Sequence, residues 1–357
     1  MTHAEHNVPL YKALKQCVTL YFEEKNISRF ANRLFWVKAV FYFLLPVAGY
    51  CLLLIYAENS LLLVFTGYLA ANAGSTLLVV NVAHDASHQC LSKNKQLNHL
   101  LAFVWNVMGI SAVQWEMQHH RSHHNHTGIP HRDVDIDENF WIRYNPTHRY
   151  RSYFRYQHLY APFLYLLFGV FVVFVKDFVM LYSGKLKPFG VDKVPRYFLW
   201  RLMLMKLVYL FIVLIIPIMV LPFAWWQVLL LYFLTLSISS GSMLVVLVIP
   251  HINKYAVTTE EELVIHNQDE WTLHQLHSNI DSSASSKWLS WLFGGLNTHL
   301  IHHLFPHVCH IHYPVLTKRL QQTLAERGLA YKHRSFLTAV ADHFSFLKQM
   351  SRPPSPV

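Results

Sequence analysis

Residues 60–88 read SLLLVFTGYLAANAGSTLLVVNVAHDASH, a long apolar run that ends in two histidines. As a helix, the run 60–83 is long enough to cross the roughly 30 Å hydrocarbon core of a bilayer. His84 and His88 follow directly and are four residues apart, so they lie on one face if the helix continues. This stretch therefore predicts a membrane-spanning helix that carries a pair of imidazoles to the membrane edge.

Three further runs have the length of a membrane span, at residues 35–57, 202–221 and 226–249. Two more apolar stretches, 97–113 and 159–175, are marginal in length. Hydrophobic residues make up 53% of the 357-residue chain, and its mean hydropathy is +0.24. Length alone would allow two soluble domains, but a chain this apolar predicts one all-α integral membrane protein with four transmembrane helices.

Two more histidine clusters have the spacing of metal ligands. The second reads QHHRSHHNHT at residues 118–127, and the third reads HLIHH at residues 299–303. In both, histidines recur four residues apart and would share a helix face. The neighbours His123 and His124 would point about 100° apart on a helix, so they can serve two different metals. Three such clusters, among 25 histidines in all, predict a shared dinuclear metal site.

The distribution of positive charge predicts the orientation in the membrane. The connections 57–61 and 221–226 contain no Lys or Arg, whereas the other connections are rich in both. The positive-inside rule then puts the two short turns outside and everything else, including the histidines, in the cytoplasm. Because the net charge of +10 comes from segments that flank apolar runs, it argues against nucleic-acid binding. The basic residues of these connections include Arg143, Arg149, Arg151, Arg155, Lys185, Lys187, Lys193, Arg196 and Arg201.

The chain is expected to form two transmembrane helical hairpins, with interfacial helices and a cytosolic helical cap. Histidine clusters on one side of the membrane must be separated by an even number of crossings, so 97–113 is expected to be a re-entrant or interfacial helix. Lys176 and Asp177 break the apolar stretch 159–182, which is therefore not expected to cross. The expected order is a cytosolic amphipathic segment (1–34), the first hairpin (35–83), a cytosolic segment with two histidine clusters (84–158), an interfacial helix and basic linker (159–201), the second hairpin (202–250), a cytosolic cap with the third cluster (251–347) and a disordered tail (348–357). The apolar face of residues 9–24 could cover the cap or lie on the membrane surface, and the sequence leaves both open.

The ligand chemistry favours iron. Structural zinc sites usually use cysteine, and the four cysteines here form no CxxC pair. An all-histidine dinuclear site beside apolar helices suits iron and dioxygen, which can remove hydrogen from an unactivated methylene. That reaction consumes electrons, so a redox partner is implied. A metal transporter is a remote alternative, because its ligands should lie near the bilayer midplane and these histidines lie at the ends of the apolar runs.

The chain resembles the membrane-bound fatty acyl desaturases, and among them the bacterial front-end (delta-six type) enzymes. The segments that carry this resemblance are 81–98, 118–128, 269–281 and, most specifically, WLFGGLNTHLIHHLFPHVCHIHYP at 291–314. The resemblance implies O2-dependent insertion of a C=C double bond into a fatty acyl chain by two iron ions. It also implies a membrane acyl substrate linked to lipid, coenzyme A or a carrier protein. An external electron donor such as ferredoxin or cytochrome b5 would complete the reaction.

The resemblance further implies which histidines bind iron. The family uses its three histidine clusters and one more histidine at the cytosolic end of the fourth span, which matches His251 in LVIPHINK. In the second cluster His119 is favoured, because Trp115 and the HH pair then align without a gap, and His120 is the alternative. No separate catalytic acid or base is implied. The implied ligands are His84, His88, His119, His123, His124, His251, His299, His302 and His303.

Two departures and one acidic run leave questions open. Front-end desaturases typically have glutamine at the position of His299, so an acetylenase that makes a triple bond, or an acyl hydroxylase, remains an alternative on the same scaffold. No HPGG motif occurs, so no fused cytochrome b5 domain is expected. The acidic run at residues 133–138 is expected to be a solvated loop, with a surface that orients a cationic partner as the alternative.

Overall fold

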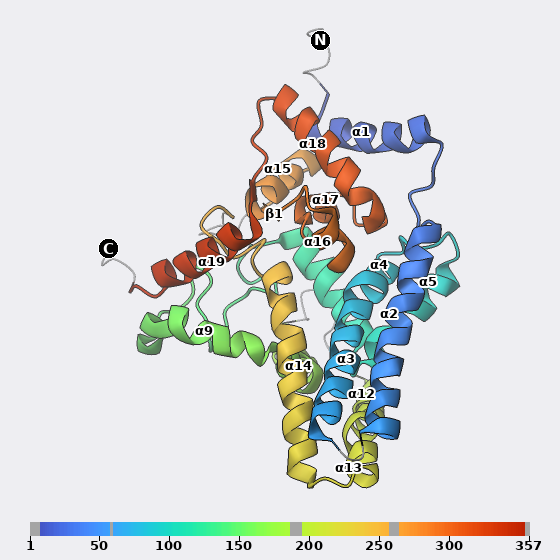
Figure 1. Cartoon of the computed structure of the whole chain (residues 1–357). Coiled ribbons are helices and arrows are strands. Elements are labelled where there is room, and N and C mark those ends of the chain that lie inside the picture. The colour runs from blue at the N-terminus through green and yellow to red at the C-terminus, as the bar shows by residue number, and fades with distance from the viewer. Residues whose placement is uncertain (1–7, 58–59, 186–194, 257–263, 354–357) are drawn as a thin grey trace.

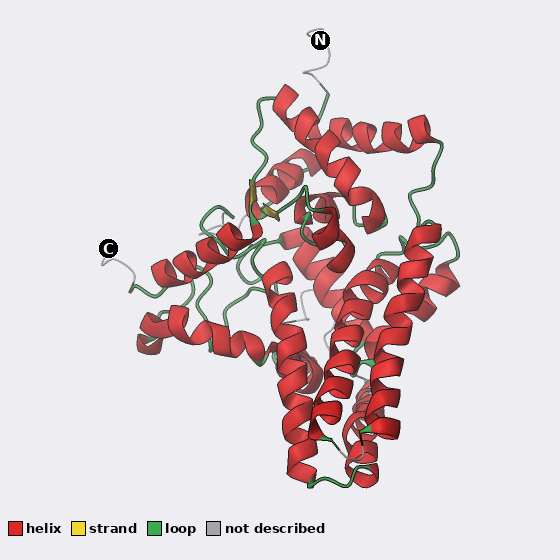
Figure 2. Ribbon diagram, in the orientation of Figure 1, coloured by secondary structure: helices red, strands yellow, loops and turns green. Residues whose placement is uncertain are grey.

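The computed structural model describes residues 8–57, 60–185, 195–256 and 264–353. Within these residues the chain is mostly helical, with connecting loops and one short pair of strands (Figure 2). Long helices form a bundle at one end of the molecule, and shorter helices form a cap at the other (Figure 1). Lys187, Lys193 and part of the predicted turn 57–61 lie outside the described residues.

Three continuous helical stretches are long and apolar enough to cross a membrane, at Arg33–Tyr56, Leu61–Ser87 and Arg196–Val220. A fourth apolar helix, α14 (Trp225–Leu247), packs against α3 in the bundle (Figure 1). All four fall on the predicted runs. The three stretches are divided into α2 (Arg33–Cys51) with η2 (Leu52–Tyr56), α3 (Leu61–Leu78) with η3 (Val79–Ala83) and α4 (His84–Ser87), and α12 (Arg196–Leu210) with η8 (Phe211–Ile215) and α13 (Ile216–Val220).

The outer faces of these helices carry large apolar side chains. Leu62 and Met219 are 71% and 76% exposed, and many similar side chains surround the bundle. Exposed apolar surface on this scale marks a surface that contacts something other than water. On the inner side, α2 and α3 approach closely at glycines: a Cβ added at Gly49 would lie 2.5 Å from the Ala71 backbone nitrogen. This close packing holds α3 against α2, and α3 continues through η3 into α4 and the first histidines.

The two marginal apolar stretches form broken helices. Residues 97–113 are divided among three short helices and the turns between them, and Gly109 adopts φ +75° in the turn after the second helix. The helical stretches Ser152–Leu166 and Phe168–Tyr182 meet at a bend of 62°. Together they form either one broken span or a re-entrant loop. The short helices are α5 (Lys95–Ala102), α6 (Val104–Val107), α7 (Ala112–Glu116), η5 (Ser152–Tyr156), α9 (Gln157–Leu166), α10 (Phe168–Phe171), η6 (Val172–Lys176) and α11 (Asp177–Tyr182).

The cap consists of the N-terminal helix and the C-terminal third of the chain. Helix α1 (Leu10–Lys25) packs its apolar face against α15 and α18, and Leu14 is fully buried there. Of the two possibilities for this face, the cap is the one observed. Helix α19 continues to Met350, so residues 348–350 of the expected tail are helical. The other cap elements are α15 (Gln268–Ser278), β1 (Asp281–Ser282), α16 (Lys287–Leu292), α17 (His299–Leu304), η9 (His310–His312), α18 (Tyr313–Glu326), β2 (His333–Arg334), parallel to β1, and α19 (Phe336–Met350).

Candidate metal centre

The three histidine clusters come together between the bundle and the cap. The first cluster occupies α4 and its end, because α3 continues into α4 without a break. The second lies on a continuous helical segment formed by η4 (Met117–His123) and α8 (His124–His126). The third lies on α17, and His251 follows the end of α14. Four separate parts of the chain therefore supply one site.

Eight of these histidines form two groups. In the first group, His84, His88, His119 and His302 each offer a ring nitrogen, and these atoms all lie within 4.8 Å of one another. In the second group, the same holds for His123, His251, His299 and His303. Nε2 of His84 lies 3.2 Å from Nε2 of His119 in the first group, and Nε2 of His123 lies 3.2 Å from Nε2 of His251 in the second. Four convergent imidazoles per group are enough to bind one metal ion each.

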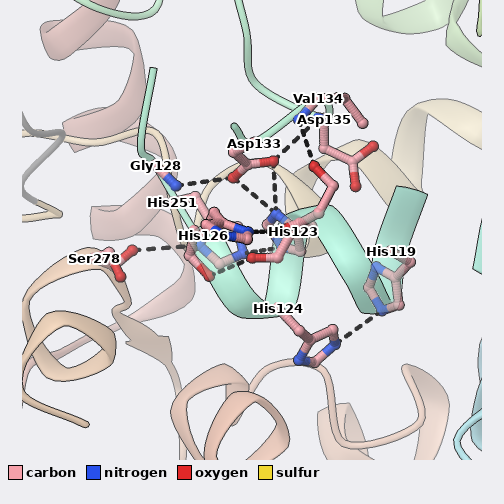
Figure 3. Close-up of polar contacts among 12 residues, drawn as sticks. His119, His123, His124, His126, Gly128, Asp133, Val134, Asp135, His251 and Ser278 are labelled. Atoms are coloured by element: carbon pink, nitrogen blue, oxygen red, sulfur yellow. Dashed lines mark hydrogen bonds and ion pairs between the residues drawn. The ribbon is translucent and has the colours of Figure 1, made fainter. Parts of the chain in front are cut away.

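His124 lies between the groups. Its Nε2 is 3.2 Å from Nε2 of His119 in the first group (Figure 3). Its ring stacks on that of His303 in the second group, with 4.4 Å between the ring centroids. His124 is therefore adjacent to both groups, as expected for the second of two neighbouring histidines on one helix.

The ring nitrogens that face the interior of the groups fit metal ligation. The Nε2 atoms of His88, His299, His302 and His303 are buried and have no hydrogen-bond partner among the described residues. Unpaired buried polar atoms are rare, because each costs roughly 1–3 kcal/mol. Four in one place indicate a ligand that takes their lone pairs, and neutral imidazole is a donor for first-row transition metals.

The outer ring nitrogens of six histidines are held by hydrogen bonds. Carboxylate and carbonyl oxygens can only accept, so the bonds of His84, His123, His251 and His299 fix Nδ1 as the protonated nitrogen and leave the Nε2 lone pair facing the group. The partners of Nδ1 are Asp85 for His84, Asp133 for His123, the Ser278 carbonyl for His251, the Leu296 carbonyl for His299, the Tyr313 hydroxyl for His302 and the Thr127 hydroxyl for His303, at 2.9 to 3.4 Å.

Asp133 was expected to lie in a solvated acidic loop, and that prediction is wrong. It is 1% exposed and accepts hydrogen bonds from the His123 ring, the Gly128 amide and the Asp135 amide (Figure 3). Two backbone N–H groups thus hold the carboxylate in place for His123. An acidic run beside a histidine cluster was the only sequence signal for this role.

Several histidines of the two groups are held in the neutral form. Burial lowers the pKa of His251, His302 and His303 well below the usual value, and the neighbouring imidazoles lower it further. The same causes lower the pKa of His299 to about 3. Burial also acts to lower the pKa of His123, but the charge and hydrogen bond of Asp133 outweigh burial and raise it. Neutral imidazoles are the form that binds metal, so little proton release is needed for binding.

An open cavity of about 770 Å³ leads to the centre. His88, His124 and His303 form part of its wall, with Trp271 and Tyr11 farther along the lining. The cavity therefore connects both groups and His124 with the exterior of the cap.

His120, the alternative to His119, belongs to neither group. Its Nε2 lies 3.4 Å from the Ser87 hydroxyl and its Nδ1 4.0 Å from Glu116, and the side chain lines the cavity. His119 instead meets both His84 and His124. The alignment of residue types and the geometry thus favour the same histidine.

Fold and site together describe a membrane metalloprotein with a buried centre of histidines. The family model for fatty acid desaturases matches residues 58–335, well over half of the chain. The chain belongs to the fatty acid desaturase family. It is a membrane enzyme, an oxidoreductase that introduces a double bond into a fatty acyl chain.

Individual relatives agree with this assignment. The sn-1 linoleoyl-lipid 6-desaturase of Arthrospira platensis is 28% identical over 344 residues, which cover 96% of this chain and 93% of the relative. The enzyme of the same name from Synechocystis sp. is 26% identical over 345 residues, covering 96% and 95%. The acyl-lipid (8-3)-desaturase of Physcomitrium patens is 27% identical over 352 residues, which cover 96% of this chain and 72% of the relative. These relatives do not favour an acetylenase, a hydroxylase or a transporter.

Proposed function

We propose that the two histidine groups bind two iron ions, which use O2 to desaturate an acyl chain of a membrane lipid. The observation that carries the proposal is the pair of four-histidine groups with unpaired, inward-facing Nε2 atoms. Bound iron would activate O2 and remove two hydrogens from neighbouring methylene carbons. The relatives named as lipid desaturases support a lipid-linked acyl chain as the substrate.

The protein's own contribution is the placement and protonation state of its ligands. The first group would hold one iron and the second group the other, with His124 available to either. His119 rather than His120 would complete the first group, because its Nε2 lies 3.2 Å from Nε2 of His84. The hydrogen bonds at Nδ1 to carboxylate and carbonyl oxygens keep His84, His123, His251 and His299 in one tautomer and orientation, which prevents a proton from occupying the ligand position.

The centre would face the cytoplasm, with α14 as the fourth span and residues 251–347 in the cytosolic cap. Two observations support this. The exposed Trp225 and Trp226 begin α14 at the end away from His251, as interfacial aromatic residues do. The turn before them has no basic residue, whereas Arg196 and Arg201 begin α12. An external donor protein would then supply electrons from the cytoplasm.

The proposal is tested by the acyl profile of a host that supplies a compatible electron donor. The wild type and His302→Ala are expressed in parallel, new unsaturation is located by mass spectrometry of derivatised acyl esters, and iron is measured in the purified proteins. A new double bond and two irons in the wild type alone support the proposal. Equal unsaturation and equal iron in His302→Ala would refute the ligand assignment, and a new alkyne or hydroxyl would favour the alternative products.

A further inference from the structure

Lys38 is a buried cation inside the first membrane-spanning stretch. It lies on α2, is 4% exposed, and extends across the faces of Tyr42 and Trp291, with Nζ 5.7 and 5.3 Å from the ring centroids. Its Nζ lies 3.0 Å from Nε2 of His310, in η9 of the cap. A buried ammonium group is costly unless its charge is balanced nearby. The contact therefore requires an explanation.

His310 connects Lys38 to a carboxylate. On the far side of its ring, Nδ1 lies 2.8 Å from Oδ2 of Asp85, and its backbone N–H donates to the same oxygen at 3.1 Å. Asp85 is 1% exposed and His310 is 2% exposed. The two residues are 225 positions apart in the chain, so the fold creates this contact between α4 and the cap.

Asp85 in turn holds a metal ligand. Its second oxygen, Oδ1, lies 3.3 Å from Nδ1 of His84, whose Nε2 faces His119 within the first group. The four side chains thus form a series, Lys38–His310–Asp85–His84, that runs from a membrane helix to the centre. One positive and one negative charge balance across a neutral His310, as a buried site requires.

The protonation of this series is fixed by donor and acceptor rules. An ammonium group can only donate, so Nε2 of His310 must accept and its proton must be on Nδ1. His310 then donates to Asp85, and the ionised carboxylate can only accept. His84 must therefore carry its proton on Nδ1, which leaves Nε2 free to bind metal. Without the ammonium group, His310 can place its proton on Nε2 and turn a lone pair toward Asp85.

We infer that Lys38 is a positioning residue for the metal centre, which fixes the tautomer of His310 and, through Asp85, the orientation of His84. The inference rests on the proposed function, since it assumes that the first group binds a metal. It ties the first group to α2, a helix that supplies no ligand. In the second group, two backbone N–H groups, those of Gly128 and Asp135, hold the corresponding carboxylate of Asp133.

Lys206 provides a matched control. It is the equivalent buried lysine of α12, 6% exposed, and its Nζ lies 2.6 Å from Asp177 and 2.6 Å from the Gly109 carbonyl. Asp177 accepts from the Ser111 amide and contacts none of the nine histidines among the interactions described. Lys206→Met therefore removes a buried ion pair of the bundle without touching the centre.

The test compares metal binding in Lys38→Met and Lys206→Met, purified as full-length monodisperse protein. Iron content is titrated at limiting iron, and Mössbauer spectra report each iron environment. Lys38→Met is expected to weaken the binding of one of the two irons by about ten- to hundredfold. It should also change the Mössbauer spectrum of that iron only. Lys206→Met is expected to lower the stability of the fold but to leave the binding and the spectra of both irons unchanged. Unchanged affinity and spectra in Lys38→Met, with two irons in the wild type, would overturn the inference alone; a wild type without two irons would overturn the proposed centre as well.

A second pair of variants decides the question if Lys38→Met does not fold. His310→Asn keeps a side-chain N–H that can donate to Asp85, and His310→Leu keeps none. The inference expects His310→Asn to retain the affected iron at least about tenfold more tightly than His310→Leu. Equal affinities in the two variants would show that donation to Asp85 does not matter, and would overturn it.

Discussion

The first and second groups each contain four histidines, but different parts of the molecule hold them. In the first group, His84 and His88 continue from a membrane-spanning stretch, and His84 is held by a series of side chains, Lys38, His310 and Asp85, that begins in α2. In the second group, the outer nitrogens of His251 and His299 donate to backbone carbonyls. We therefore expect the geometry of the first group to depend on how the membrane helices pack. The geometry of the second group should depend on the folding of the cap.

The largest expected effect comes from removing one ligand in each group. His88→Ala and His251→Ala should each abolish desaturation, because each takes one of four nitrogens from a metal. If the groups are independent, each variant should lose one iron and keep the other, as measured by iron content and Mössbauer spectra. Loss of both irons in either variant would mean that the two groups form one unit, and the comparison would fail.

Next in size is the difference between His119→Ala and His120→Ala, which tests the membership of the first group. His119→Ala should abolish activity and release iron, because its Nε2 lies among those of the first group and near His124. His120→Ala should keep both irons and lose about tenfold or less in rate, since His120 contacts Ser87 and lines the cavity. Acyl profiles and iron content measure the difference. If His120→Ala rather than His119→Ala lost iron and activity, His120 would be the ligand and His119 would not.

Short-range patterns predicted much of the fold and of the ligand set. The apolar runs 35–57, 60–83 and 202–221 match the observed stretches closely, because a membrane span depends on length and hydrophobicity alone. The histidines spaced four apart were evident because helix periodicity brings them together. The 62° bend within 152–182 was not predicted, since it depends on how these helices pack against α14.

The residues that hold the ligands were the part that the sequence did not reveal. His251 is a lone histidine, and only the family resemblance selected it. Asp133 looked solvated because its neighbours are acidic, yet its burial depends on contacts with Gly128 and His123. Lys38 and its partner His310 are 272 residues apart in the chain. Such contacts follow from tertiary packing, which local patterns do not specify.

A smaller effect is expected from Asp133→Asn, which tests what holds the second group. The amide can no longer attract the His123 Nδ1 proton as a carboxylate does, so iron affinity in the second group should fall about ten- to hundredfold. The first group should keep its iron. Asp137→Asn is the matched control, because Asp137 lies in the same acidic run and pairs with Lys185, 2.9 Å away. Equal iron loss in both variants would assign the effect to the loop rather than to His123.

The smallest expected effect is a pH dependence of the metal-free protein, and it concerns His299. Its pKa is lowered to about 3 in the folded state, whereas it would be about 6.5 in the unfolded chain. Below about pH 6.5 the unfolded state therefore binds a proton that the folded state does not, so stability falls as pH falls. From about pH 7 to pH 5, this histidine alone should reduce the free energy of unfolding by about 2 kcal/mol. His299→Gln removes this titrating group. Over the same pH range its free energy of unfolding should therefore fall by about 2 kcal/mol less than that of the wild type. Denaturant unfolding of both metal-free proteins in detergent at the two pH values measures the difference, and identical pH profiles would show that His299 is not held neutral by burial.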